Sequence, residues 1–239
     1  MIDLRLFGTD LDREALGSLH ALLDGDERER ARSFRFERDR ARFIARRGQL
    51  RLLLSEHLAR APSEIVYARG RFGKPRVEQA GDLRFNLSHS DGLALCAIAR
   101  GVEIGCDIER RRSDLASPET AERFFAAEEQ RILRDYRGAQ WVKGFFDCWT
   151  RKEAYVKALG DGLSCPLDSF HVSLEPEGAT RLEGAGRAWR VTGFAPAPCY
   201  HAAVAIEIRE EIGATPPDPR AWIGGKRGEL VPPGAFRFD

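Results

Sequence analysis

The sequence predicts an α+β fold made of two similar subdomains, because the same order of elements occurs twice along the chain. Helices are expected over residues 26–60, 117–136 and 140–159, and strands over 83–89, 92–99, 102–109, 169–175, 188–194 and 200–208. In each half, helical segments come first, and short strands joined by tight links follow. A chain of 239 residues, 43% of them hydrophobic, is long enough to bury a core in each half.

Local signals mark where the predicted elements end. Ala61-Pro62 closes the first helix, and the Gly/Pro-rich stretch 69–77 is expected to be a turn. Ser117 before Pro118 is typical of a helix start, and Gly160 is typical of a helix end. We expect an N-terminal subdomain over 1–104, a C-terminal subdomain over 105–212 and an extended, proline-containing tail over 213–239.

Composition excludes several classes of protein. The 38 Lys and Arg residues stand against 37 Asp and Glu, whereas a nucleic-acid-binding protein would carry a larger basic excess. No run of 18 apolar residues predicts a membrane helix, and the charges of Asp3 and Arg5 are not typical of a signal peptide. The five cysteines are scattered and form no CxxC pair, so we expect reduced thiols in a cytoplasmic protein.

The first predicted helical segment has an apolar face and an arginine-rich face. Apolar residues recur at steps of three and four from Phe43 to Leu58, which predicts burial of one side. Between Arg28 and Arg51 there are ten Arg but only three acidic residues, a local excess of seven positive charges. Such a run is often a solvated surface, whereas its one-sided sign favours an anionic partner.

Asp107 and Glu109 end the third predicted strand. Side chains at i and i+2 of a strand point to the same face, about 6–7 Å apart, so these two anions repel each other. The three arginines at 110–112 could neutralise them in a salt-bridged strand end. The alternative is a hard divalent cation, whose natural ligands are carboxylates. The D-x-E pattern leaves both interpretations open.

The helix predicted over 140–159 carries a third carboxylate. Trp149, Glu153 and Lys157 recur at four-residue steps and therefore share one face. An exposed Glu–Lys pair is the simplest interpretation, but the aromatic residues nearby indicate that this face turns toward protein. There, Glu153 would complete a Mg²⁺ site and Lys157 would hold a phosphate, because magnesium usually completes its shell with phosphates and water.

Four motifs together resemble the signature of the 4'-phosphopantetheinyl transferases. They are FGKP (72–75), FNLSHS (85–90), GCDIE (105–109) and WTRKEAYVKALGDGL (149–163), and the resemblance covers roughly residues 1–210. The length and the two halves are similar to the larger, monomeric, surfactin-type class. The resemblance implies that family's fold, with two similar α+β subdomains related by a pseudo-twofold axis and an active site at their interface.

The resemblance also implies an activity and a set of site residues. The family transfers the 4'-phosphopantetheine arm of coenzyme A to a serine of an apo acyl or peptidyl carrier protein and releases 3',5'-ADP. By resemblance, Mg²⁺ (or Mn²⁺) would be held by Asp107, Glu109 and Glu153, the catalytic residues would be Glu153, Lys157 and Asp107, and coenzyme A would contact Arg42, Arg47, Lys74, Ser88, His89, Asp107 and Lys157. Glu153 is the candidate base, acting directly or through a water.

Other functions remain open at this point. The same carboxylates would suit a Mg²⁺-dependent nucleotide phosphohydrolase, and a non-catalytic carrier-protein-binding module could keep the fold. Glu27 stands where a family member can carry a lysine for the 3'-phosphate, so no contact is expected there. Phe124 and Phe125 either belong to the core or form part of a carrier-protein surface. The sequence does not distinguish fatty-acid, polyketide, nonribosomal-peptide and siderophore carriers.

Overall fold

The computed structural model describes residues 2–69, 73–160, 165–175, 179–184 and 186–209. The helices are α1 (Arg13–Ala21), α2 (Gly25–Arg32), α3 (Glu37–Leu58), α4 (Pro118–Phe124), α5 (Ala127–Leu133) and α6 (Gly138–Leu159). The strands are β1 (Ile2–Gly8), β2 (Tyr67–Arg69), β3 (Pro75–Val77), β4 (Leu83–Ser90), β5 (Leu93–Arg100), β6 (Ile104–Arg110), β7 (Ala179–Gly184), β8 (Arg187–Phe194) and β9 (Tyr200–Ile208). The predicted tail over 213–239 lies outside the described residues.

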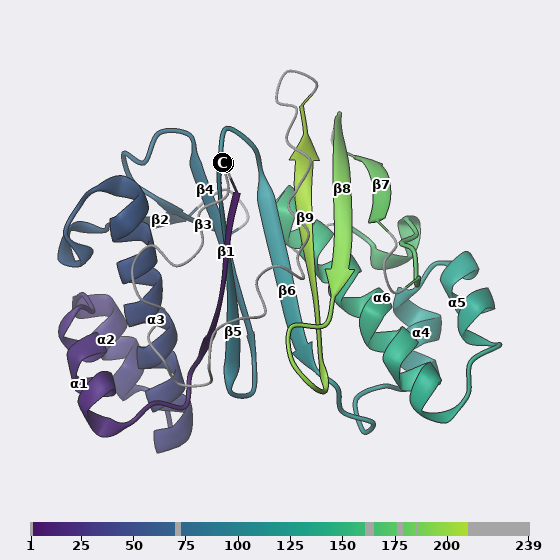
Figure 1. The fold of residues 1–239 in the computed structure, drawn as a ribbon, viewed down its shortest axis with the longest axis horizontal. Coiled ribbons are helices and arrows are strands. Elements are labelled where there is room, and N and C mark those ends of the chain that lie inside the picture. Colours follow the sequence, from purple (N-terminus) through teal and green to yellow (C-terminus); the bar gives the residue numbers. More distant parts are fainter. Residues whose placement is uncertain (1, 70–72, 161–164, 176–178, 185, 210–239) are drawn as a thin grey trace.

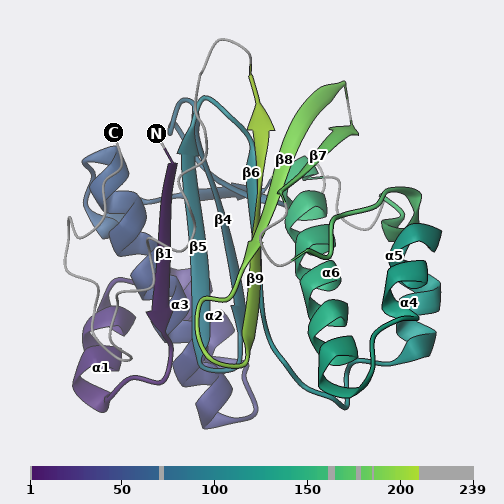
Figure 2. The ribbon, with the colours of Figure 1, turned by 45° about the vertical axis from the view of Figure 1, so that its right-hand side comes forward.

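Two antiparallel sheets stand face to face in the centre of the molecule, and helices cover their outer faces (Figures 1 and 2). The first sheet has the order β1-β5-β4, with α3 beside it, and the second has the order β6-β9-β8-β7, with α6 beside it. Each half thus combines a 22-residue helix with an antiparallel sheet. The predicted α+β class is confirmed, whereas the 104/105 subdomain boundary stays a prediction.

Three apolar layers hold this arrangement together. One lies between α3 and the first sheet, around Leu54 and Phe85, and another lies between α6 and the second sheet, around Phe145 and Trp189. The third fills the space between the two sheets, where Leu95 and Ile98 belong to opposite faces of β5 and only Leu95 turns toward Ile108 of β6. Because both faces of β5 are buried, its sequence is almost uniformly apolar.

The tight links predicted over 83–109 would make each of these three strands pair with the next along the chain, and this is wrong for the last strand. β4 and β5 form the expected hairpin, but β6 pairs with β9, with Asp107 opposite Ala203. Between β4 and β6, side chains replace the backbone ladder: Asn86 Oδ1 accepts the N–H of Cys106 at 2.8 Å, and Ser90 Oγ accepts the N–H of Arg110 at 3.0 Å. The seam between the halves therefore runs between these two strands.

The prediction of a strand over 169–175 is also wrong. Buried side chains bind the backbone of this segment in place of a neighbouring strand: Lys152 Nζ donates to the carbonyls of Leu167 (2.7 Å) and Phe170 (2.6 Å), and Glu129 Oε1 accepts the N–H of Val172 (2.7 Å). The strand that completes the sheet is β7, further along the chain.

The segment 26–60, predicted to be helical, contains two helices in the structure, α2 and α3. Residues 33–36 separate α2 from α3, because the Ser33 hydroxyl bonds the Arg30 carbonyl at 2.8 Å and the Phe34 ring folds back onto Phe43, with centroids 5.3 Å apart. The segment 117–136 likewise contains two short helices, α4 and α5. The helix predicted over 140–159 is confirmed as α6, and its predicted end at Gly160 has the left-handed backbone conformation that favours glycine, with φ 77°.

The helices of the described residues include none that is both long enough and apolar enough to span a membrane.

Candidate functional site

Gly105 brings the helix of the C-terminal half against strand β6. A Cβ atom at this position would lie 2.3 Å from the carbonyl oxygen of Ala154 and 2.3 Å from the amide nitrogen of Ala158, so no larger residue fits without moving α6. This close approach places the α6 turn that carries Glu153 and Lys157 beside Asp107, two residues after the glycine on the same strand. Local sequence thus determines how near the predicted site residues come to one another.

Asp107, Lys157 and Ser88 form a hydrogen-bonded cluster across the seam. Lys157 Nζ lies 2.5 Å from Asp107 Oδ1, and the Ser88 hydroxyl donates to the same oxygen at 2.7 Å. Lys157 also lies 3.2 Å from Ser88 Oγ. Because Ser88 comes from β4, Asp107 from β6 and Lys157 from α6, both halves contribute to this cluster, as expected for a site at their interface.

Glu109 continues the cluster along β6. Its Oε2 atom accepts a hydrogen bond from the Ser90 hydroxyl at 2.7 Å, as Asp107 does from Ser88. The alternation of β4 therefore matches that of β6, and the prediction that the two carboxylates share a face is supported by these parallel contacts. Arg110, the arginine that follows Glu109, pairs with another carboxylate: its Nη1 atom donates to Asp91 at 2.9 Å. This contact does not support the interpretation of a strand end neutralised by arginines.

Burial and the charge of Asp107 raise the pKa of the two neighbouring carboxyls, Glu109 and Glu153. Burial and the charge of Asp107 raise the pKa of Glu109 to about 7. Burial also raises the pKa of Glu153, an effect that Lys157 opposes and Asp107 reinforces. Burial alone would lower the pKa of Lys157, but its bond to Asp107 raises it, so this side chain remains an ammonium. The site has more negative charge than Lys157 neutralises.

The residues present fit a divalent cation held by few protein ligands. Asp107 is 2% exposed, and its second oxygen, Oδ2, is buried and has no hydrogen-bond partner among the described residues. Carboxylate oxygens are the donors that Mg²⁺ prefers, and Mg²⁺ usually takes one or two of them together with phosphate and water. Within the described part of the chain, no three His, Cys, Asp or Glu residues are grouped to hold a metal ion. The predicted three-carboxylate set is therefore not assembled here and stays a prediction.

Glu109 makes the stability of the protein without added metal depend on pH. Its folded-state pKa of about 7 lies above the ordinary value of 4.5, so the folded state holds a proton that the unfolded state releases. The unfolding free energy is therefore unaffected by this group below pH 4.5, and it falls as the pH rises from 4.5 through 7. Relative to wild type, Glu109→Gln should gain up to roughly 3 kcal/mol of unfolding free energy between pH 4.5 and 8, which urea unfolding at each pH measures. A difference that does not change with pH would contradict the raised pKa.

Lys74, predicted to bind a phosphate of coenzyme A, bonds to protein groups in this structure. Its ammonium lies 3.0 Å from Glu103 Oε2 and donates to the carbonyls of Ile104 and Ala158, each also at 3.0 Å. These three bonds use the three N–H groups of a lysine. Lys74 thus ties the N-terminal half to β6 and to the end of α6, and its predicted role in binding coenzyme A stays untested.

Two of the predicted arginines are engaged by acidic side chains. Arg42 forms a bidentate pair with Asp10, at 2.6 and 2.9 Å, beside a cavity of about 680 Å³ that reaches Arg110 and Tyr200. Arg47 bonds Glu27 at 2.5 Å. Its guanidinium also lies over the ring of Tyr67, 4.2 Å from the centroid.

Glu27 organises the start of the arginine-rich region. It is 6% exposed, closes a capping box with Asp24 at the start of α2, and accepts bonds from Arg47 and Arg51 of α3. This explains the acidic residue at a position where the family can carry a lysine: Glu27 turns inward and joins α2 to α3.

Arg46 is a candidate site residue that was not predicted from the sequence. This residue of α3 is half-buried and, among the described residues, makes no ion pair with an acidic side chain. Burial and the charge of Arg42 lower the pKa of Arg46 to about 10; Asp39 opposes this shift, and Arg47 adds to it. The signal that could have identified it is helical rotation: Arg46 and Arg47 differ by about 100° around the axis, so both cannot face the same partner.

His89 lies beside Arg46. Phe85 and Leu87 of β4 pack against the core under α3, so His89, two residues further along, points to the same side. Partial burial and the charges of Arg46, Lys157 and Arg42 lower the pKa of His89 to about 4, and its imidazole is therefore neutral at pH 7. Arg42, Arg46 and Lys157 together form a cationic region around the neutral His89, next to the carboxylates.

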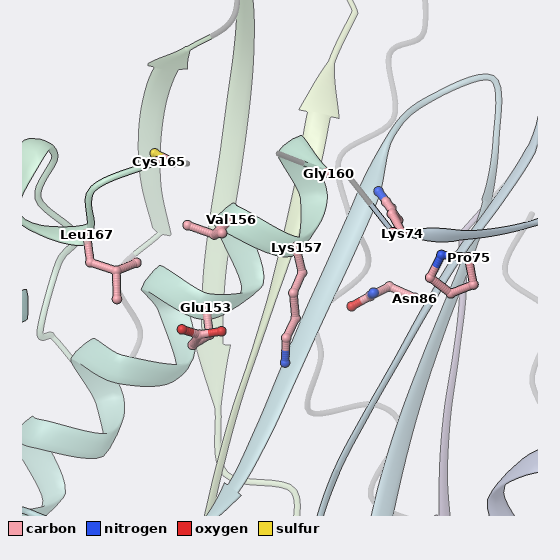
Figure 3. Close-up of a pocket in the computed structure, with 10 residues that line it drawn as sticks. Lys74, Pro75, Asn86, Glu153, Val156, Lys157, Gly160, Cys165 and Leu167 are labelled. Carbon is pink, nitrogen blue, oxygen red and sulfur yellow. The ribbon is translucent and has the colours of Figure 1, made fainter. Parts of the chain in front are cut away.

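A cavity of about 330 Å³ opens beside Glu153 and Lys157 (Figure 3). Its walls come from α6 on one side and from Lys74, Pro75 and Asn86 of the N-terminal half on the other. Asn86 has a structural role here, because its side-chain oxygen accepts the N–H of Cys106. Of the two phenylalanines considered for a carrier-protein surface, Phe125 is 1% exposed and belongs to the core. The Phe124 ring packs edge-on against Trp149.

Each half matches a protein-family model of its own. The family described as the 4'-phosphopantetheinyl transferase superfamily matches residues 103–205, and the one described as 4'-phosphopantetheinyl transferase, N-terminal, matches residues 12–100. These matches cover the strands and helices that form the seam.

Curated relatives agree with these matches. The chain is 40% identical over 203 residues to the 4'-phosphopantetheinyl transferase HetI of Nostoc sp., covering 82% of this chain and 84% of the relative. It is 30% identical over 184 residues to the 4'-phosphopantetheinyl transferase Sfp of Bacillus subtilis, covering 75% and 81%. The chain belongs to the 4'-phosphopantetheinyl transferase superfamily.

Proposed function

We propose that this protein transfers the 4'-phosphopantetheine arm of coenzyme A to a serine hydroxyl of an apo acyl or peptidyl carrier protein, with Mg²⁺ as its cofactor. The observation that carries the proposal is the cluster at the seam, where Asp107, Glu109, Glu153 and Lys157 lie next to the cationic region around Arg46. A compound with a pyrophosphate and a 3'-phosphate matches this neighbourhood of carboxylates and cations.

Asp107 and Glu109 would hold the metal, with coenzyme A phosphates and water completing its shell. When bound, Mg²⁺ supplies charge neutralisation at the pyrophosphate and polarises the phosphorus that is attacked. The fit rests on Oδ2 of Asp107, which no residue of the described ranges pairs, and on the raised pKa of Glu109; a divalent cation would satisfy the oxygen and lower this pKa. Mn²⁺ suits the same oxygen donors.

Glu153 is the proposed base. During transfer, the serine oxygen forms a bond to the β-phosphorus, the bond from that phosphorus to the 3',5'-ADP oxygen breaks, and the serine proton leaves to Glu153 directly or through one water. Burial raises the pKa of this carboxyl toward the range of a useful proton acceptor. Lys157 would neutralise the pyrophosphate, which is the main demand of phosphoryl transfer on a protein.

The products distinguish this function from its alternatives. Coenzyme A should yield 3',5'-ADP only when an apo carrier protein is present, as followed by chromatography of the nucleotides. Nucleotide breakdown without the carrier protein would indicate a phosphohydrolase. Binding of the carrier protein with no product would indicate a non-catalytic module.

Arg46 is expected to bind the anionic end of coenzyme A, while Arg47 stabilises the fold. Arg46→Ala should weaken coenzyme A binding about tenfold, measured by calorimetry, because a charge-assisted contact is lost without breaking an ion pair of the free protein. Arg47→Ala should lower the unfolding free energy by about 1–2 kcal/mol, because the buried Glu27 carboxylate would lose one of the two arginines, Arg47 and Arg51, that neutralise its charge. The reverse pattern would contradict the assignment.

The partner assignment is broader than a single pathway. The protein is proposed to act as a cytoplasmic monomer on carrier proteins, and a panel of apo carrier proteins from fatty-acid, polyketide, nonribosomal-peptide and siderophore systems, compared by kcat/KM, would identify the preferred one. Sedimentation at several protein concentrations tests the monomeric state.

A further inference from the structure

The strand next to Glu109 places a buried histidine beside it. In the antiparallel pairing of β6 with β9, Glu109 lies directly opposite His201. Directly opposed residues of two strands point to the same face of a sheet, with Cβ atoms about 4.5–5.5 Å apart. His201 is 5% exposed, so its imidazole lies in the protein interior at the position next to the Glu109 side chain.

The orientation of His201 is held by helix α6. Its Nδ1 atom lies 2.7 Å from Asp147 Oδ1, and the ring stacks on Phe146 at 5.9 Å between centroids. Asp147 also pairs with Lys143 at 2.5 Å. Burial would raise the pKa of Asp147, but the bonds from His201 and Lys143 keep it below its ordinary value, so the carboxylate is ionised and Nδ1 donates.

Glu109 is thereby bordered from both halves. Ser90 of β4 fixes its Oε2 atom, while the imidazole from β9 occupies the neighbouring position on the sheet. We propose that His201, held by Asp147, is a positioning residue that keeps the Glu109 carboxylate directed toward Asp107 and the metal. The inference rests on the proposed function. Residues that orient metal ligands without binding the metal have this arrangement in many sites.

Metal binding measured without turnover tests this role. Mn²⁺ binding to the protein saturated with coenzyme A, followed by the electron paramagnetic resonance signal of free Mn²⁺, should weaken about 10–100-fold in His201→Ala. Asp147→Asn, which keeps the size of the side chain but removes its charge, should weaken binding in the same direction. His201→Gln, which restores a polar side chain at this position, should recover part of the affinity.

His57 provides a matched control. Its Nε2 atom also lies 2.8 Å from an aspartate, Asp3, and its side chain is 13% exposed, but it lies on α3 and bonds to β1. His57→Ala should cost comparable stability and leave the Mn²⁺ affinity unchanged. A similar loss of Mn²⁺ affinity in both histidine variants would overturn the inference, because the effect would then be one of general stability.

The failure of this inference differs from a failure of the proposed function. Wild-type Mn²⁺ affinity in both His201→Ala and Asp147→Asn, together with weakened binding in Glu109→Ala, would overturn the positioning role alone. An absence of Mn²⁺ binding to the wild-type protein with coenzyme A would overturn both. Weakened binding in the His201 and Asp147 variants, with His57→Ala unchanged, supports the inference.

Discussion

Replacing Glu153 by glutamine is expected to lower the rate of arm transfer by about 10²–10⁴-fold, the usual contribution of a general base. Glutamine has the shape of glutamate but cannot accept the serine proton. Coenzyme A binding should change little, because the Lys157–Asp107–Ser88 cluster does not depend on Glu153 for any of its bonds. The kcat and the coenzyme A affinity, measured separately, distinguish these effects.

An exposed glutamate provides the control for this variant. Glu128 on α5 pairs with Arg131 at 2.8 Å, and both side chains are more than half exposed. Glu128→Gln should leave kcat unchanged. Wild-type kcat in Glu153→Gln would refute its role as base.

Replacing Lys157 by methionine is expected to lower kcat/KM by about 10²–10³-fold, as the loss of one group that stabilises developing charge does elsewhere. The unfolding free energy should also fall, by about 1–3 kcal/mol, because the Asp107 side chain, which is 2% exposed, loses the ammonium group that neutralises it. The cost stays below that of a fully buried pair, since Lys157 is 32% exposed. Steady-state kinetics and urea unfolding measure the two effects.

Two comparisons make the Lys157 result specific. Lys157→Arg keeps the charge and should retain more activity than the methionine variant. Arg131→Met removes an exposed ion pair from α5. This variant should leave kcat/KM unchanged and alter the unfolding free energy by no more than a few tenths of a kcal/mol. Equal losses in the arginine and methionine variants of Lys157 would mean that its charge is not what the reaction needs.

Periodicity in the sequence was enough to predict much of the site. Asp107 and Glu109 belong to a regular strand, and Glu153 and Lys157 to a regular helix, so the side on which each points follows from spacing alone. The contacts of Ser88 and Ser90 with these carboxylates, however, depend on the packing of β4 against β6. The short links predicted instead that β6 pairs with β5, because all three strands are apolar and their composition does not indicate which neighbour each pairs with.

The arginines show where local reasoning ends. The excess of positive charge in 28–51 was visible, but which arginine turns inward depends on Glu27, whose partners on α3 are 20 and 24 residues away. Nor could a lone histidine near the end of the chain be connected with Glu109, since that relation exists only through the pairing of β6 with β9. The wrongly predicted strand over 169–175 has the same origin, in bonds from the buried Lys152 and Glu129.

The intact mass of an apo carrier protein, incubated with coenzyme A and this protein, tests the account most directly. With Mg²⁺ present, the carrier protein should gain the mass of one 4'-phosphopantetheine arm, attached to a serine. With a chelator in place of Mg²⁺, or with Asp107→Asn in place of the wild-type protein, the gain should disappear. No gain on any apo carrier protein with Mg²⁺, or an equal gain in the presence of the chelator, would contradict the account.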